Sequence, residues 1–127
     1  MKEIIKTDKA PLPIGPYNQA IKAGGVLYVS GQIAINPSDG TLVNASLEGE
    51  THQVLKNLGA ILHEAGLDYK DVVKCTVFIK DMNSFSRINA VYGQYFIEAT
   101  APARETVEVS NLPKFVAVEI SAIAVYP

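Results

Sequence analysis

The sequence lacks a second cysteine, a cluster of basic residues and a long apolar run, and each absence excludes a class of protein. Cys75 has no partner for an internal disulfide, which excludes a small secreted scaffold held together by such bonds. The 11 Lys and Arg residues do not outnumber the 13 Asp and Glu residues, and the net charge is -2. Nucleic-acid binding is therefore not expected. No apolar run approaches the ~20 residues of a membrane helix, so membrane association is not expected either.

The motifs that bind nucleotides and metals are also absent. There is no Gly-rich phosphate loop, HExxH motif, paired-cysteine site or nucleophile elbow. His52 and His63 lie eleven residues apart on one predicted helix, about 16 Å along its axis, and cannot hold one metal. The sequence therefore predicts no cofactor and no metal site. Residues 1–6 are charged and lack the apolar core of a signal peptide, so we expect a cytoplasmic protein.

What the sequence does contain is the composition of one folded domain. Apolar residues make up 48% of the 127 residues and charged residues 19%, which is typical of a globular chain. No linker, repeat or low-complexity tract divides it. We therefore predict a single domain over residues 1–127.

Apolar periodicity and turn residues predict two helices among several strands. A proline-rich loop precedes a hairpin that turns at Gly24-Gly25, with Tyr17 entering its first strand. The remaining predicted elements are a helix from Ser46 to Gly66, a strand over Val72–Ile79, a second helix capped by Asn83 or Ser84, and strands over Arg104–Val109 and Phe115–Tyr126.

The first helix has the clearest sequence signals. Ser46 is a suitable N-cap, Glu48 and Glu50 complement the positive first turn, and Gly66 suits the left-handed position beyond the last turn. In the strand that follows, alternation places Val73 on the same face as Cys75, Val77 and Ile79. Cys75 is accordingly interpreted as a buried apolar residue rather than a nucleophile.

The predicted order is strand, strand, strand, helix, strand, helix, strand, strand, which indicates an α+β layer with two helices on one sheet face. The other face carries apolar residues as well, for which Val118, Ile120, Ala122 and Phe78 are the expected examples. Covering such a face with further copies of the chain would remove it from water, so we predict a homo-oligomer.

Two charged residues on the last strands are the best candidates for chemistry. The planar fork of Arg104 suits a carboxylate, and alternation places Thr106 on the same face. Glu119 stands alone in an apolar run, where burial would raise its pKa and suit it to acid–base work. By residue type alone, two solvated charges on edge strands are the favoured explanation, because most charged residues on strands face solvent.

An ordered set of short motifs runs along the whole chain. They are Ile14-Gly15-Pro16-Tyr17, Ser30-Gly31-Gln32, Val77-Phe78-Ile79-Lys80-Asp81, Asn89-Ala90-Val91-Tyr92, Pro102-Ala103-Arg104 and Val118-Glu119-Ile120-Ser121-Ala122. In residues, order and spacing this set closely resembles the RidA (YjgF/L-PSP) family of reactive intermediate deaminases.

The resemblance implies a chorismate-mutase-like (ferredoxin-like) α+β fold assembled as a homotrimer, with sites in the clefts between subunits. It implies hydrolysis of 2-iminobutanoate and 2-iminopropanoate to 2-oxo acids and ammonia, without a cofactor. Arg104 matches the arginine that holds the substrate carboxylate, and Glu119 the glutamate associated with the attacking water. Tyr17, Ser30 and Gly31 match positions that line the cleft, and Asn89 matches a recurrent helix asparagine.

Two positions depart from the resemblance. Thr106 stands where many members have a cysteine, which removes thiol chemistry but leaves a hydroxyl able to donate a hydrogen bond. Glu105 replaces a residue that is usually small, and alternation turns it to the face opposite Arg104.

Two other functions stay open at this stage. A trimeric module could bind 2-oxo acids through Arg104 without turning them over. The older endoribonuclease name of the family suggests RNA cleavage, although the chain has neither a basic groove nor a suitable pair of histidines.

Overall fold

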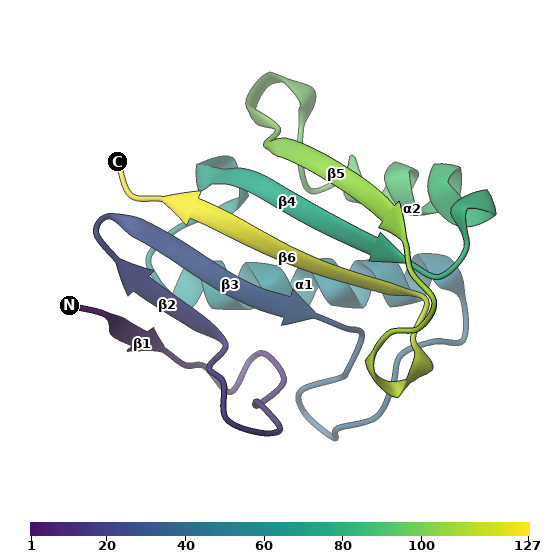
Figure 1. Cartoon of the computed structure of the whole chain (residues 1–127), viewed down its shortest axis with the longest axis horizontal. Helices are drawn as coiled ribbons and strands as arrows, with labels where there is room; N and C mark the ends of the chain where they lie inside the picture. Colours follow the sequence, from purple (N-terminus) through teal and green to yellow (C-terminus); the bar gives the residue numbers. More distant parts are fainter.

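The computed structural model describes residues 1–127 as a six-stranded sheet with two helices (Figure 1). The elements are β1 (Glu3–Ile5), β2 (Ala20–Ala23), β3 (Val26–Gln32), α1 (Leu47–Glu64), β4 (Val72–Ile79), α2 (Phe85–Tyr92), β5 (Ala103–Glu108) and β6 (Val118–Val125). This confirms the predicted order of strands and helices. Neither helix combines the length and the apolar character that crossing a bilayer requires.

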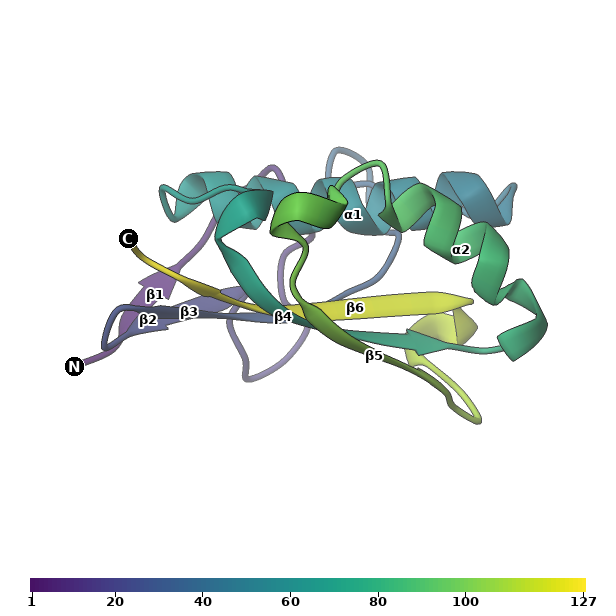
Figure 2. The same ribbon diagram turned by 90° about the horizontal axis from the view of Figure 1, so that it is seen from above.

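The strands lie side by side in the order β1-β2-β3-β6-β4-β5. All neighbouring pairs are antiparallel except β4 and β5, which are parallel because α2 carries the chain back across the sheet between them. Both helices lie on the same side of the sheet, and the other side carries no helix (Figure 2). The predicted α+β class with two helices on one face is therefore confirmed. We call the uncovered side the open face.

The predicted caps of α1 are present. The Ser46 hydroxyl accepts a hydrogen bond from the Gly49 backbone N–H at 3.0 Å. At the other end, Gly66 adopts a φ of 80°, which lets the Leu67 N–H donate to the carbonyl of Leu62 at 2.8 Å. Local sequence thus determines where this helix begins and ends.

Two predicted strand boundaries are wrong, whereas Ser84 does occupy the N-cap position of α2, as predicted. The Ser84 side chain makes no capping hydrogen bond, and the Asp81 side chain accepts from the Asn83 N–H at the start of the short 3-10 turn before it. Tyr17 lies outside β2, which begins at Ala20, because the proline-rich loop continues as far as residue 19. Phe115 precedes β6 and has a φ of 56°, a left-handed conformation that a strand excludes.

A β-bulge near the start of β4 changes the predicted faces of that strand. Val72 pairs with Ala124 and Lys74 with Ile123, so β4 has one extra residue at this point. Val72 is therefore buried, whereas Val73 is 44% exposed rather than inside with Cys75. Simple alternation holds only after the bulge.

The open face is less apolar than the sequence suggests. Val118, Ile120 and Ala122 are all buried on the helix-covered face, so they were wrong examples of an uncovered apolar surface. Phe78 does lie on the open face, half-buried, and Val107 beside it is 39% exposed. Oligomerisation through this face stays a prediction.

Glu50 connects α1 to the start of β6. Its side chain is only 4% exposed, and one carboxylate oxygen accepts hydrogen bonds from the backbone N–H groups of Ala117 and Val118, at 2.7 and 3.1 Å. Its place in the first turn of α1 also favours a negative charge. The acidic residue predicted to complement the helix dipole therefore also fixes the approach to β6.

We expect Glu50→Ala to lower the free energy of unfolding by about 2–4 kcal/mol, because two backbone N–H groups lose their acceptor. Denaturant unfolding at one fixed protein concentration measures this loss. Glu64→Ala is the matched control, since Glu64 is exposed on the same helix. Equal stability of the two variants would contradict the role given to Glu50.

Candidate functional site

Arg104 lies on the edge strand β5, on the face that α2 covers. Its strand partner in register is Cys75, which is completely buried on that face. The guanidinium Nη1 donates a hydrogen bond to Oδ1 of Asn89 at 2.7 Å. Its Cζ lies 4.7 Å from the ring centroid of Tyr92 and 5.6 Å from that of Phe85. Arg104 forms no ion pair, so its charge is available to an anion.

The space beside Arg104 is a cleft of about 560 Å³. Its walls are the end of α2 and the segment that leads into β5, formed by Asn89, Tyr92, Gly93, Phe96, Glu98, Ala101, Pro102 and Arg104. Thr106 lines a narrow crevice next to it and shares the face of Arg104, as alternation predicts. Arg104, Asn89 and Thr106 are thus brought together.

Glu119 projects to the open face, opposite to Arg104. Its neighbours Val118 and Ile120 are completely buried on the helix-covered face, so alternation turns Glu119 the other way. The side chain is half-buried, and burial raises the pKa of its carboxyl. No protein donor forms a hydrogen bond with this carboxylate, which leaves both oxygens free for water or a ligand.

Gly31 makes room for the Glu119 carboxylate. Val29 of β3 pairs with Ala122 of β6, and Gln32 pairs with Ile120. β3 therefore has one extra residue between these pairs, which is a β-bulge. A Cβ atom on Gly31 would lie 2.1 Å from Oε2 of Glu119, so any other residue would force the carboxylate to move. Glycine at this position therefore allows the close approach of the carboxylate.

Glu119 and Gly31 line a second cleft, of about 340 Å³. Tyr17 and Lys114 form part of its wall, together with Pro11, Leu12, Ile14, Gln19, Gln32, Ile33, Ile35 and Pro113. Lys114 has a φ of 55°, a strained conformation that clusters at functional sites. Ser30 is adjacent but does not line the cleft, and its hydroxyl donates to the carbonyl of Asn18 at 2.6 Å.

Within one chain, the predicted site residues form two separate groups. Arg104, Asn89 and Thr106 lie under α2, whereas Glu119, Gly31 and Tyr17 lie at the second cleft. One copy of the chain does not bring Arg104 to Glu119. The two groups can act on one ligand only if they come from different copies.

Glu105 and Cys75 both have structural roles in the sheet. Glu105 points away from Arg104, as predicted, and forms an ion pair with Lys74 at 2.6 Å. Cys75 is completely buried, and burial raises the pKa of its thiol to about 11. The interpretation of Cys75 as an apolar core residue is confirmed, since a thiolate is not available there.

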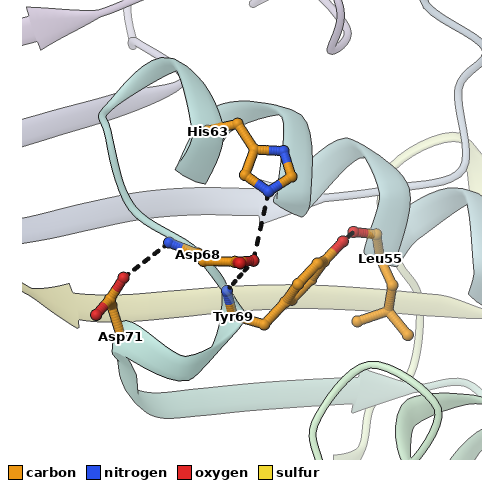
Figure 3. A network of polar contacts seen from close by, with 5 residues as sticks. All are labelled: Leu55, His63, Asp68, Tyr69 and Asp71. Atoms are coloured by element: carbon orange, nitrogen blue, oxygen red, sulfur yellow. Dashed lines mark hydrogen bonds and ion pairs between the residues drawn. The ribbon is translucent and has the colours of Figure 1, made fainter.

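The histidines are held by separate partners. His63 lies 3.4 Å from Oδ1 of Asp68, in the network drawn in Figure 3. In the same network the Asp71 carboxylate accepts from the Asp68 N–H and the Asp68 carboxylate accepts from the Tyr69 N–H (Figure 3). The Tyr69 hydroxyl donates to the carbonyl of Leu55. Nδ1 of His52 lies 2.8 Å from the Tyr95 hydroxyl, and the His52 side chain is half-buried. No group of three or more His, Cys, Asp or Glu side chains is arranged to hold a metal ion.

Sequence reasoning missed two residues of these clefts. Tyr92 appears in the sequence only as the end of the motif Asn89-Ala90-Val91-Tyr92, although its spacing of three from Asn89 places both on one helix face. Lys114 belongs to none of the motifs. Nothing in the sequence signals its position beside Glu119, because that depends on how the loop before β6 folds against the loop before β2.

Comparisons with known proteins give a consistent result. Residues 7–126 match the family model described as endoribonuclease L-PSP. A RutC family protein from Synechocystis sp. is 57% identical over 98% of this chain and 97% of its own length. The 2-iminobutanoate/2-iminopropanoate deaminase of Mus musculus is 46% identical over 98% of this chain and 92% of its own. The crystal structure of E. coli TdcF with bound serine superposes with a TM-score of 0.92 at 44% identity, covering 98% and 99% of the two chains.

Proposed function

Because the chain belongs to the endoribonuclease L-PSP (RidA/YjgF) family, we propose that it hydrolyses short 2-imino acids to 2-oxo acids and ammonia. The observation that carries the proposal is the Glu119 carboxylate, which is half-buried in a cleft beside Gly31 and has no protein donor. A carboxylate with a raised pKa and a free oxygen can orient a water molecule and take its proton. The relatives named as imine deaminases support the same reaction.

The proposed reaction needs one anion receptor and one base. Arg104 binds the substrate carboxylate through the N–H groups that Asn89 does not use. Glu119 removes a proton from a water molecule, whose oxygen forms a bond to the imine carbon C2 while the imine nitrogen takes up a proton. The resulting carbinolamine then releases ammonia, and its hydroxyl becomes the carbonyl of the 2-oxo acid. Holding the carboxylate presents C2 to a fixed water molecule rather than to bulk solvent.

We further propose that each site is formed by two copies of the chain, in the homotrimer that the resemblance implies. Arg104 and Glu119 lie on opposite faces of one sheet, so no motion of their side chains brings them to one small ligand. A cleft between subunits removes this obstacle, because one copy supplies Arg104 and its neighbour supplies Glu119, Gly31 and Tyr17.

Mixing two inactive variants tests the shared site. Arg104→Ala and Glu119→Gln chains are unfolded together, refolded as mixed oligomers and assayed. Random mixing gives about one quarter of the sites an intact Arg104 and an intact Glu119, so we expect about a quarter of the wild-type rate. Refolding each variant alone provides the control. A mixture that is no more active than the separate variants would contradict a site shared between copies.

The reaction itself is tested by coupling the protein to a threonine dehydratase and measuring the release of 2-oxobutanoate.

The second candidate is a module that binds 2-oxo acids or amino acids without turnover, which the serine bound to TdcF favours. Such a module would be stabilised by 2-oxobutanoate but would not speed its release. Faster release with the wild-type chain excludes a pure binding module.

RNA cleavage is the activity in the name of the family model. The net charge of -2 and the single arginine of the first cleft do not favour a polyanion. Cleavage of RNA that is lost in Arg104→Ala would support this activity instead.

A further inference from the structure

Tyr92 supports the guanidinium of Arg104, and the proposed reaction gives Tyr92 no role. The Arg104 Cζ lies 4.7 Å from the centroid of the Tyr92 ring, within the range of a cation–π contact. Asn89, one turn earlier on α2, accepts from Nη1 at 2.7 Å. An arginine on an exposed edge strand would otherwise occupy many rotamers. The contacts with Asn89 and Tyr92, both on α2, hold the Arg104 side chain in one conformation.

The Tyr92 ring is itself fixed in the core. It is 6% exposed and packs on Phe96, with ring centroids 4.6 Å apart and an angle of 32° between the planes. Its hydroxyl is buried beside the Cys75 thiol, a weak hydrogen-bonding group, and forms no hydrogen bond of good geometry. An unpartnered buried hydroxyl destabilises a fold. The useful part of Tyr92 is therefore its ring, which offers Arg104 a rigid face.

We propose that Tyr92 and Asn89 are positioning residues that orient Arg104 for binding a 2-oxo or 2-imino carboxylate. The Tyr92 ring supports the face of the guanidinium, and Asn89 occupies one of its five N–H donors. The N–H groups on the other edge then point into the cleft of about 560 Å³, where a carboxylate can be bound by two parallel hydrogen bonds. The inference rests on the proposed function for the choice of ligand, but it concerns binding and not the chemical step.

Two measurements on the intact protein test it: the Kd of 2-oxobutanoate by titration calorimetry, and KM and kcat in the dehydratase-coupled assay. We expect Tyr92→Leu to raise Kd and KM about 2- to 5-fold, the range of a cation–π contact in which the cation is exposed. Because neither Tyr92 nor Asn89 belongs to the group that supplies Glu119, kcat should change by less than about twofold. Asn89→Ala should raise Kd and KM in the same way, and Asn89 is exposed, so the fold is not at risk.

Two further variants separate positioning from packing. Tyr92→Phe keeps the ring face and should restore most of the affinity lost in Tyr92→Leu. Tyr95→Leu is the matched control, because Tyr95 does not contact Arg104. The Tyr95 ring packs on Tyr69, with ring centroids 5.5 Å apart, and its hydroxyl contacts His52. The substitution should lower stability without changing Kd or KM.

The inference is overturned if Asn89→Ala and a folded Tyr92→Leu bind 2-oxobutanoate like the wild type. It is also overturned if Tyr92→Phe is as defective as Tyr92→Leu, or if Tyr95→Leu raises Kd equally. Should Tyr92→Leu fail to fold, Asn89→Ala and Tyr92→Phe decide the outcome. A wild type that binds 2-oxobutanoate but does not speed its release would refute the proposed reaction alone, and the binding measurements would still test the positioning of Arg104.

Discussion

Arg104→Ala should lower kcat/KM for 2-iminobutanoate about 10²- to 10³-fold, because each charge-assisted hydrogen bond to the carboxylate contributes roughly 1.5–3 kcal/mol. Arg104 forms no ion pair, so none of this energy is already used within the protein. The residue is exposed on an edge strand, and its removal should leave the thermal stability nearly unchanged. The dehydratase-coupled assay measures the loss, with calorimetry as the test of folding.

Arg87→Ala is the matched control for Arg104→Ala. Arg87 is also an exposed arginine and lies on α2 itself, but its guanidinium is bound to Glu48 by two hydrogen bonds of 2.8 and 2.9 Å. Losing this pair should leave kcat/KM unchanged. If Arg104→Ala and Arg87→Ala behave alike, Arg104 does not bind the substrate and the proposed mechanism is wrong.

Glu119→Gln should lower kcat about 10²- to 10⁴-fold, the usual contribution of a positioned general base. The substitution keeps the size of the side chain and therefore the fit against Gly31. Since Arg104 is retained, 2-oxobutanoate should bind with nearly the wild-type Kd. Glu64→Gln, at an exposed position on α1, serves as the control and should keep wild-type kinetics.

The raised pKa of Glu119 predicts how activity and stability depend on pH. The base must be ionised, so wild-type kcat should fall as the pH drops through a pKa above the usual 4.5 of a glutamate. The folded chain binds this proton more tightly than the unfolded chain. The free energy of unfolding should therefore fall as the pH rises from the usual pKa of a glutamate to the raised pKa of Glu119. Glu119→Gln should lack both effects. An unchanged acid limb in the kcat profile of this variant would exclude Glu119 as the base.

The fold was predictable where the determining signal is local. Ser46 and Gly66 set the ends of α1 through their own hydrogen bonds and φ, and Gly24-Gly25 sets the hairpin turn. The predictions fail where the conformation depends on a strand that is distant in the sequence. The bulge that turns Val73 outward exists only because β4 pairs with β6, and the sequence of β4 alone contains no sign of it.

The candidate site was predictable as a set of residues but not as an arrangement. Glu119 could be recognised as the only charge in an apolar run, and Arg104 from its fork and its place after a proline. That the two point to opposite faces follows from the register with β4, in which Arg104 pairs with Cys75 and Glu119 pairs with Phe78, three residues further along the strand. This register depends on pairing between strands far apart in the chain, which no local pattern encodes.

The central position of β6 has a consequence for how the chain folds. Strands β1 to β3 and strands β4 to β5 do not pair with each other, and β6, the last element of the chain, joins them. During synthesis the two parts of the sheet are therefore made before the strand that connects them, and the contacts that complete it have large sequence separations, which slows folding. Glu119 lies on this strand, so the proposed base reaches its place only in the step that closes the sheet.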